Sequence, residues 1–354
     1  MTKNVFPPKS VLPRLVLLFL LACRTHAPEP RLQVPMVTDE AQAVLVLLDR
    51  VADGEAPGDA EWQRLFATEG YRRLKQREHS LSRPFEDSAF RAFLRSDTLL
   101  ARADALRRTL AAWTRVDPGA AARHAFAYLP REAVIHAKVY PVIKPKTNSF
   151  VFESRTNPAI FLYLDPAVSP AKLDNILIHE LHHIGVGSVC PAEVQDSTLS
   201  QPVRTALAWM GGFAEGRAVL TAAGKPEIHP HATSDSAERA IWDRDLAHAA
   251  RDMRRLEEFF LALLDDRLSE DEQARRGMSF IATEEIPQGA YYTVGWLMAS
   301  TVERRLGRQR LVATLCDPVG FLGDYNSAAM QGRTGAVRLP LWSDTLMARL
   351  RTAR

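Results

Sequence analysis

The spacing of apolar residues changes twice along this chain of 354 residues, and these two changes limit the folds that it can adopt. From Thr38 to about Pro130, apolar residues recur every three or four positions, which is the spacing of helices that bury one face. Between about Ala133 and Leu164 they form short runs rich in β-branched and aromatic residues, which is typical of strands. Helical spacing then returns and continues to the C-terminus. The pattern predicts a mostly helical α+β protein.

The expected elements follow from these runs. Thr38 is the expected N-cap of the first helix, and the other helices of this N-terminal lobe are expected near 61–77, 86–95 and 98–115. One small antiparallel or mixed sheet is expected from three strands, at 134–140, 149–152 and 159–164. The helices that follow it are expected near 169–185, 200–224, 235–266 and 289–306.

The N-terminus has the features of an export signal. Three basic residues precede the apolar run 15–22, which is too short to span a bilayer because a spanning helix needs about 20 residues. Residues 20–23 resemble the lipobox of bacterial lipoproteins, which implies that the signal is removed and that Cys23 is lipidated. By resemblance to the sorting rule of Gram-negative lipoproteins, Arg24 implies the outer membrane. A plain signal peptide and an uncleaved anchor are the alternatives. The prolines up to Pro35 suit a semi-rigid tether.

The charge of the chain argues against a nucleic acid as its partner. The formal net charge is +3, and Lys3, Lys9 and Arg14 account for it, since the other 45 − 3 basic residues equal the 42 acidic ones. Phosphate binding needs a concentrated basic surface, and the body of this chain has no block of lysine and arginine. The two remaining cysteines, Cys190 and Cys316, could pair in an exported protein or could be free buried thiols.

The sequence His179-Glu180-Leu-His182-His183 carries the clearest chemical signal. Ser169 and Pro170 favour a helix start, and Gly185 and Gly187 are expected to stop the helix. Residues four apart share a helix face, so His179 and His183 can present two imidazoles to one metal ion. Glu180 is placed to act on a metal-activated water as a general base. His182 is expected to be a supporting or exposed residue.

A catalytic zinc needs a third protein ligand and one open position. Val186 and Val189 stand where the metzincin pattern requires glycine and histidine, so that class is excluded. Glu215 is the preferred third ligand, in the middle of the expected helix and on a face of small residues that another helix can approach. A carboxylate on a packed face is costly unless it is paired or metal-bound. Glu193 and Asp196 are the rival candidates.

Other polar residues could assist the reaction. Tyr291 and Tyr292 open an expected helix, and a phenol directed at the metal would stabilise the oxyanion that forms when water attacks a carbonyl. His229 and His231, in an expected loop, could do the same or could be solvated. Either the strand at 149–152 or that at 159–164 could bind an extended peptide along its edge.

HELHH followed by a Glu-Gly pair on a later helix resembles the gluzincin metallopeptidases. The chain is also similar to an uncharacterised bacterial family of presumed zinc-dependent peptidases over roughly residues 130–330, and the similar stretches are HELHHIGVGS, 213–216 and 289–296. The resemblance implies one Zn²⁺ with His179, His183 and Glu215 as ligands and Glu180 as base. The spacing differs from thermolysin-like enzymes, because 31 residues, 184–214, separate the last histidine from Glu215.

These observations predict a zinc metallopeptidase that acts on peptides or proteins at the bacterial cell envelope. We expect a signal peptide (1–22), a lipidated cysteine with a Pro-rich tether (23–36), a helical lobe (37–130) and a catalytic domain (131–354). One alternative is a catalytically idle lipoprotein that binds a peptide or a cell-wall component. Another is a zinc hydrolase that acts on a non-peptide amide. Glu180 argues against the idle protein, since a structural zinc site needs no base.

Overall fold

The computed structural model describes residues 31–83, 85–190, 198–283, 286–331 and 339–352, and Arg31 to Arg354 form one compact unit. The expected signal peptide, Cys23 and most of the expected tether lie outside the described residues. Among the residues described, none of the helices combines the length and the apolar character that crossing a membrane requires.

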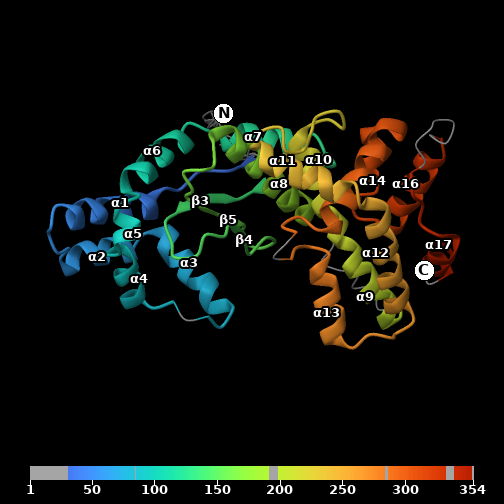
Figure 1. The fold of residues 1–354 in the computed structure, drawn as a ribbon, viewed down its shortest axis with the longest axis horizontal. Helices are drawn as coiled ribbons and strands as arrows, with labels where there is room; N and C mark the ends of the chain where they lie inside the picture. The colour runs from blue at the N-terminus through green and yellow to red at the C-terminus, as the bar shows by residue number, and fades with distance from the viewer. Residues whose placement is uncertain (1–30, 84, 191–197, 284–285, 332–338, 353–354) are drawn as a thin grey trace, which may run out of the picture. The chain divides into compact units, whose positions relative to one another are not determined.

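The N-terminal half of the unit is helical, as the sequence predicted (Figure 1). The expected helix at 61–77 is divided in two, because Thr68 accepts a hydrogen bond from the Tyr71 amide and so begins a new helix. Asp39 also accepts hydrogen bonds from the Glu69 and Gly70 amides at this helix start. The helices are α1 (Asp39–Ala52), α2 (Asp59–Phe66), α3 (Glu69–Ser80), α4 (Asp87–Leu94), α5 (Asp97–Leu100), α6 (Ala103–Trp113) and α7 (Pro118–Phe126).

The central sheet is small and mixed, which confirms the predicted fold class. Its strands β3 (Lys138–Val142), β5 (Ala159–Tyr163) and β4 (Phe150–Phe152) lie in the order β3-β5-β4. β3 pairs with β5 in parallel and β4 pairs with β5 antiparallel. All five residues of β5 are buried. Because β5 is central, only β4 of the two strands considered for peptide binding lies at an edge.

A second pair of strands joins the N-terminus of the described chain to the fold. β1 (Leu32–Gln33) pairs in parallel with β2 (Ile135–His136), and the Val34 side chain is buried. The last residues of the segment expected to be a tether are therefore part of the compact unit.

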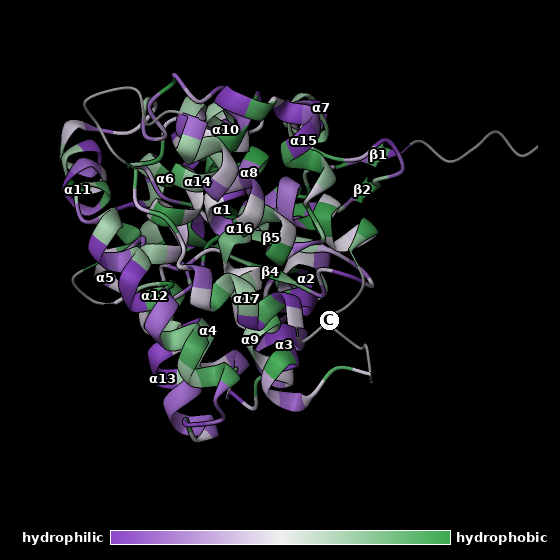
Figure 2. Cartoon of the chain, turned by 90° about the vertical axis from the view of Figure 1, so that its right-hand side faces the viewer, coloured by the Kyte–Doolittle hydropathy of each residue, from purple (hydrophilic) through white to green (hydrophobic). Residues whose placement is uncertain are grey.

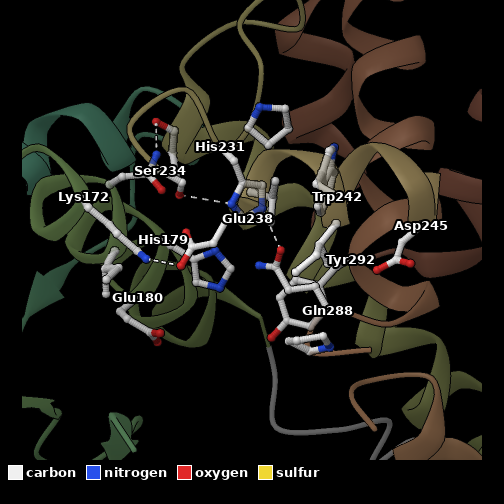
Figure 3. A pocket seen from close by; sticks show the side chains of 17 residues that line it. Lys172, His179, Glu180, His231, Ser234, Glu238, Trp242, Asp245, Gln288 and Tyr292 are labelled. Atoms are coloured by element: carbon white, nitrogen blue, oxygen red, sulfur yellow. Dashed lines mark hydrogen bonds and ion pairs between the residues drawn. The ribbon is translucent and has the colours of Figure 1, made fainter. Parts of the chain in front are cut away.

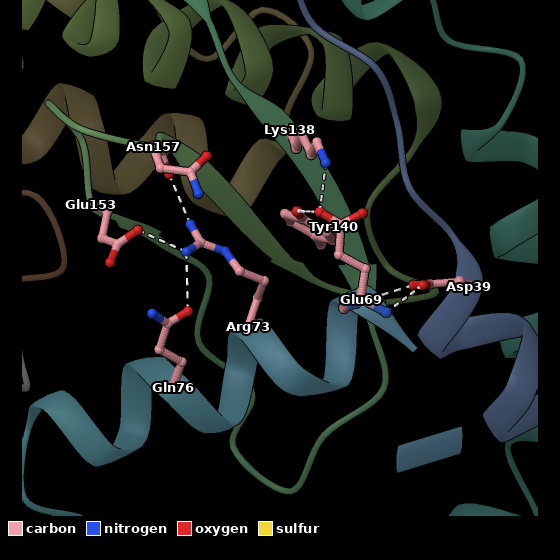
Figure 4. Close-up of polar contacts among 9 residues, drawn as sticks. Asp39, Glu69, Arg73, Gln76, Lys138, Tyr140, Glu153 and Asn157 are labelled. Carbon is pink, nitrogen blue, oxygen red and sulfur yellow. Dashed lines mark hydrogen bonds and ion pairs between the residues drawn. The ribbon is translucent and has the colours of Figure 1, made fainter. Parts of the chain in front are cut away.

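Polar contacts fix α3 against the sheet (Figure 4). Arg73 donates hydrogen bonds to the Glu153 carboxylate at 2.7 Å and to the Asn157 carbonyl at 2.8 Å, both in the connection between β4 and β5. Glu69 accepts a hydrogen bond from the Tyr140 hydroxyl on β3 at 2.8 Å. One helix thus holds both a strand and the turn that positions the edge strand.

The C-terminal half is an assembly of helices in which α14 is deeply buried. α13 is mostly exposed, and Figure 2 shows it as largely hydrophilic. The elements are α8 (Pro170–Val189), α9 (Gln201–Met210), the 3₁₀ turn η1 (Gly211–Phe213), α10 (Ala214–Ala223), α11 (Ser236–Leu246), α12 (Ala249–Leu264), α13 (Glu270–Ser279), α14 (Ala290–Leu306), α15 (Arg308–Ala313), α16 (Pro318–Gln331) and α17 (Asp344–Thr352).

Two expectations about helix ends were wrong. α8 does not stop at Gly185 or Gly187 but continues to Val189. Gly185 is required for close packing instead, because a Cβ at this position would lie 2.1 Å from Leu129 Cδ1. The helix expected at 200–224 is interrupted by η1, so Glu215 lies in the first turn of α10 and not in the middle of a long helix.

A disulfide joins Cys190, at the C-terminal end of α8, to Cys316, which follows α15. The two cysteines left open by the sequence are thus paired, and the link connects the end of α8 to a helical segment far along the chain.

Candidate metal centre

His179, His183 and Glu215 meet at one point between α8 and α10. His179 Nε2 lies 3.1 Å from His183 Nε2 and 3.2 Å from Glu215 Oε2, and His183 Nε2 lies 3.3 Å from the same carboxylate oxygen. The side chains of His179, His183 and Glu215 are 16%, 23% and 25% exposed, so the site is sheltered but reached by solvent. Among the described residues these three form a group that could hold a metal ion.

The size of this triangle fits a tetrahedral zinc ion. Two ligand atoms each about 2.0–2.1 Å from one Zn²⁺ lie about 3.3–3.4 Å apart when they subtend the tetrahedral angle. The three observed separations, 3.1, 3.2 and 3.3 Å, are close to that value. Two imidazoles and one carboxylate are also donors that zinc accepts in catalytic sites, where a fourth position stays open.

Glycine contacts bring Glu215 to the two histidines. α10 packs against both α8 and α14. A Cβ on Gly216 would lie 2.1 Å from the Trp296 amide nitrogen and 2.2 Å from the Gly295 carbonyl carbon, so only glycine fits where α10 meets α14. The Asn175 side chain on α8 donates a hydrogen bond to the Ala222 carbonyl at 3.1 Å. Glu215, next to Gly216, is thereby held beside α8.

The electrostatics of the triangle favour a cation at its centre. Burial alone would raise the pKa of Glu215, but the two neighbouring histidines lower it well below its ordinary value. Burial lowers the pKa of His183, yet the Glu215 carboxylate outweighs this effect and raises it to about 9. A fixed negative charge that faces two imidazole nitrogens attracts either a proton or a metal ion to the same place.

Glu180 and Tyr292 flank the triangle without belonging to it. Both side chains line the same cavity as His179. The Tyr292 ring stacks on the His179 ring, with centroids 6.2 Å apart and an interplanar angle of 11°. Burial and the nearby Glu215 carboxylate raise the pKa of Tyr292, so its phenol keeps its proton and can donate a hydrogen bond.

Tyr291 does not share this position. Its side chain is fully buried, and its ring packs against Phe213 and Phe280 with centroids 5.4 and 6.1 Å away. Successive helix residues point in directions about 100° apart, so only one of the two tyrosines can face the triangle. Tyr291 therefore lies in the hydrophobic core, and of the two candidates named from the sequence only Tyr292 lines the cavity.

The remaining histidines have other surroundings. His182 is buried, with 1% of its surface exposed. It does not belong to the group of three side chains that could hold a metal ion. His229 contacts Asp243 at 3.0 Å, whereas His231 lines the cavity and contacts the Gln288 amide oxygen at 2.7 Å. The rival ligands Glu193 and Asp196 lie outside the described residues.

A cavity of about 390 Å³ extends from the triangle (Figure 3). Sequence reasoning missed most of its lining, although the side chains from α8 follow a helical spacing that could have revealed one shared face. Further lining residues come from α11 and from the segment before α14, and their assembly depends on tertiary packing. The residues missed include Lys172, Asn175, Ile176, Glu238, Trp242, Asp245 and Gln288.

Comparison with known proteins gives one match. The model of a family described as "Putative zinc dependent peptidase (DUF5700)" matches residues 62–334, which is most of the chain and includes every residue of the triangle and its two flanking side chains. No curated protein and no solved structure matches the chain.

Proposed function

We propose that this chain, which belongs to the family described as "Putative zinc dependent peptidase (DUF5700)", hydrolyses peptide bonds with one Zn²⁺ and with Glu180 as general base. The convergence of His179, His183 and Glu215 within 3.1–3.3 Å is the observation that carries the proposal. These side chains would hold the ion, and the fourth position would remain free for the reaction.

Each residue then has a defined task. Zinc in this site would polarise a carbonyl group and lower the pKa of water. The Glu180 carboxylate accepts the proton of the attacking water and can pass it to the leaving amine. The Tyr292 hydroxyl donates a hydrogen bond to the oxyanion that forms on the substrate carbonyl. Tyr292 also stacks on His179, which keeps that imidazole oriented.

We place this reaction at the bacterial cell envelope, with Cys23 as a lipid anchor in the outer membrane. The basic and apolar N-terminal residues and the Leu-Leu-Ala-Cys sequence support export and lipidation. The disulfide between Cys190 and Cys316 also supports an oxidising compartment, since such bonds are rare in the cytosol.

Two variants separate the base from a ligand. Glu180→Gln should keep its zinc while peptide hydrolysis falls by a factor of about 10²–10⁴, because Glu180 lies outside the ligand triangle. Glu215→Ala should lose both zinc and activity. Zinc content measured by plasma emission and cleavage of a fluorescence-quenched peptide library give the two readouts. A fully active Glu180→Gln protein, or equal zinc in both variants, would contradict the mechanism.

The same assay addresses the alternatives. An idle binding protein would cleave nothing in the library even when fully loaded with zinc. A hydrolase of non-peptide amides would also leave peptides intact but would lose its own activity in Glu180→Gln. The position of Glu180 beside the triangle favours a catalytic over a structural zinc site.

A further inference from the structure

The cavity beside the triangle is also lined by side chains of α11, and in Figure 3 Asp245 of that helix lies on the opposite side from Glu180. Most of its surface is apolar, from α8, α10 and α11. A long side chain with an aliphatic stem could occupy this space, since burial of apolar surface is favourable. The apolar lining includes Ile176, Val219, Ala222, Ile241 and Trp242.

The charged groups of the lining are predominantly negative. They are Lys172, Glu180, Glu238 and Asp245, which give one positive and three negative charges. Lys172 forms an ion pair with Glu238, so these two charges balance each other. Glu180 flanks the triangle. Of the three negative charges, only that of Asp245 is neither balanced by Lys172 nor assigned a role in the reaction.

Asp245 is held in place but is not fully neutralised. It is 9% exposed, and its neighbour Arg244 makes both of its contacts, at 2.8 Å, to the same oxygen, Oδ1. The Arg244 side chain is 53% exposed, so water screens much of its charge. In the described part of the chain, both of these contacts leave Oδ2 aside, and we take Oδ2 as the atom that a ligand would reach. A carboxylate this deep in a cavity gains most from a cationic partner.

An aromatic wall lies beside this carboxylate. Trp242 precedes Asp245 by three residues on α11, and its indole is almost completely buried. The His231 ring packs on the Trp242 ring with centroids 5.2 Å apart, and burial lowers the pKa of His231, so this neighbour adds no positive charge at neutral pH. Indole rings attract cations to their faces. In Figure 3, Tyr292 and Gln288 lie between Glu180 and Asp245.

We propose that this cavity binds a cationic group of the peptide substrate, with Asp245 as its charge partner and Trp242 as the wall beside it. The cation has two possible sources, a lysine or arginine side chain near the scissile bond or the free amino terminus of the peptide. This proposal rests on the proposed function and adds a substrate class to it. Asp245 is a specificity residue, since it lies away from the reacting atoms.

The test uses the full-length, zinc-loaded protein and three sets of fluorescence-quenched peptides. The first set is acetylated and carries one lysine at each position in turn, the second replaces that lysine with norleucine, and the third is the norleucine set with a free amino terminus. We expect kcat/KM to rise by about 10- to 100-fold for lysine at one position or for the free terminus, as a hydrogen-bonded charge allows. The set that responds identifies the source of the cation.

Three variants show whether Asp245 causes the preference. Asp245→Asn should reduce the preference to within about 3-fold, while Asp245→Glu, which keeps the charge, should retain most of it. Asp252→Asn is the matched control, because Asp252 is also 9% exposed and also paired with the preceding arginine, Arg251, but does not line this cavity. No preference in the wild type, or an equal preference in Asp245→Asn, would overturn the proposal.

A binding measurement separates this proposal from the proposed function. The zinc-loaded Glu180→Gln protein is titrated with the lysine and norleucine peptides by calorimetry, without turnover. If the wild type cleaves no peptide but the variant binds the cationic peptides more tightly, the cavity proposal stands and the peptidase proposal fails. If peptides are cleaved with no preference for a cation, the peptidase proposal stands and the cavity proposal fails.

Discussion

Glu40 is a buried carboxyl group whose ionisation should make the stability of the protein depend on pH. It lies in the first turn of α1 and is 1% exposed. Its Oε2 accepts a hydrogen bond from the Ile143 amide at 3.0 Å, whereas Oε1 is buried and has no hydrogen-bond partner in the part of the chain that the structure describes. Burial raises the pKa of Glu40 from 4.5 to about 8, although the Ile143 amide and the charge of Lys144 act in the opposite direction.

The size of the effect follows from that shift in pKa. Below pH 4.5 both the folded and unfolded states carry the proton, and the full stability is present. Between pH 4.5 and about 8, Glu40 keeps its proton in the folded state but loses it in the unfolded state, so the free energy of unfolding falls as pH rises. At about 1.4 kcal/mol per pH unit, the loss is about 5 kcal/mol over this range and about 3 kcal/mol between about pH 5.0 and 7.5.

Glu40→Gln tests this reasoning, because the amide oxygen can still accept the Ile143 hydrogen bond but cannot ionise. Urea unfolding at pH 5.0 and 7.5 gives the free energy of unfolding of both proteins, and their difference should move by about 3 kcal/mol in favour of the variant at the higher pH. The range stops at pH 7.5 because burial lowers the pKa of Lys144 to about 8. Glu55→Gln, at a side chain that is 53% exposed, controls for the substitution itself. A difference that stays constant to within about 1 kcal/mol would refute the argument.

Two further predictions concern the active site and the anchor. Tyr292→Phe should lower kcat by a factor of about 10²–10³ with unchanged zinc, since one oxyanion donor is lost. Tyr291→Phe should change kcat little, because its buried hydroxyl has no hydrogen-bond partner among the described residues. Equal losses in the two variants, measured with the same quenched peptide, would mean that Tyr292 has no special role. Cys23→Ala should move the protein from the membrane to a soluble or unprocessed fraction in a cell fractionation. Wild-type protein found in the cytoplasm would contradict the proposed lipid anchor.

Local sequence patterns determined the main parts of the site. Ser169 accepts a hydrogen bond from the Lys172 amide and begins α8, which carries His179 and His183, where the sequence predicted. The four-residue spacing of His179 and His183 places both imidazoles on one face, because this geometry depends on the helix alone. The change in apolar spacing likewise gave the fold class and located β4 and β5, since each element must bury one face. The run expected as one strand at 134–140 is instead divided between β2 and β3, which belong to different sheets. Such features involve residues that are close in the chain.

Tertiary structure decided what distant segments bring together. Glu215 was chosen for an expected mid-helix position, yet it reaches the histidines from a helix start that the contact between Gly216 and Gly295 holds in place. Glycine often ends a helix, but Gly185 lies within α8, where its lack of a side chain allows close packing against Leu129. Nothing in the sequence around Asp245 indicates a binding role, because such a role depends on the cavity that distant segments form around the carboxylate. Spacing along the chain determines which residues are neighbours within a helix turn. Contacts across the core depend instead on the simultaneous packing of side chains from many segments.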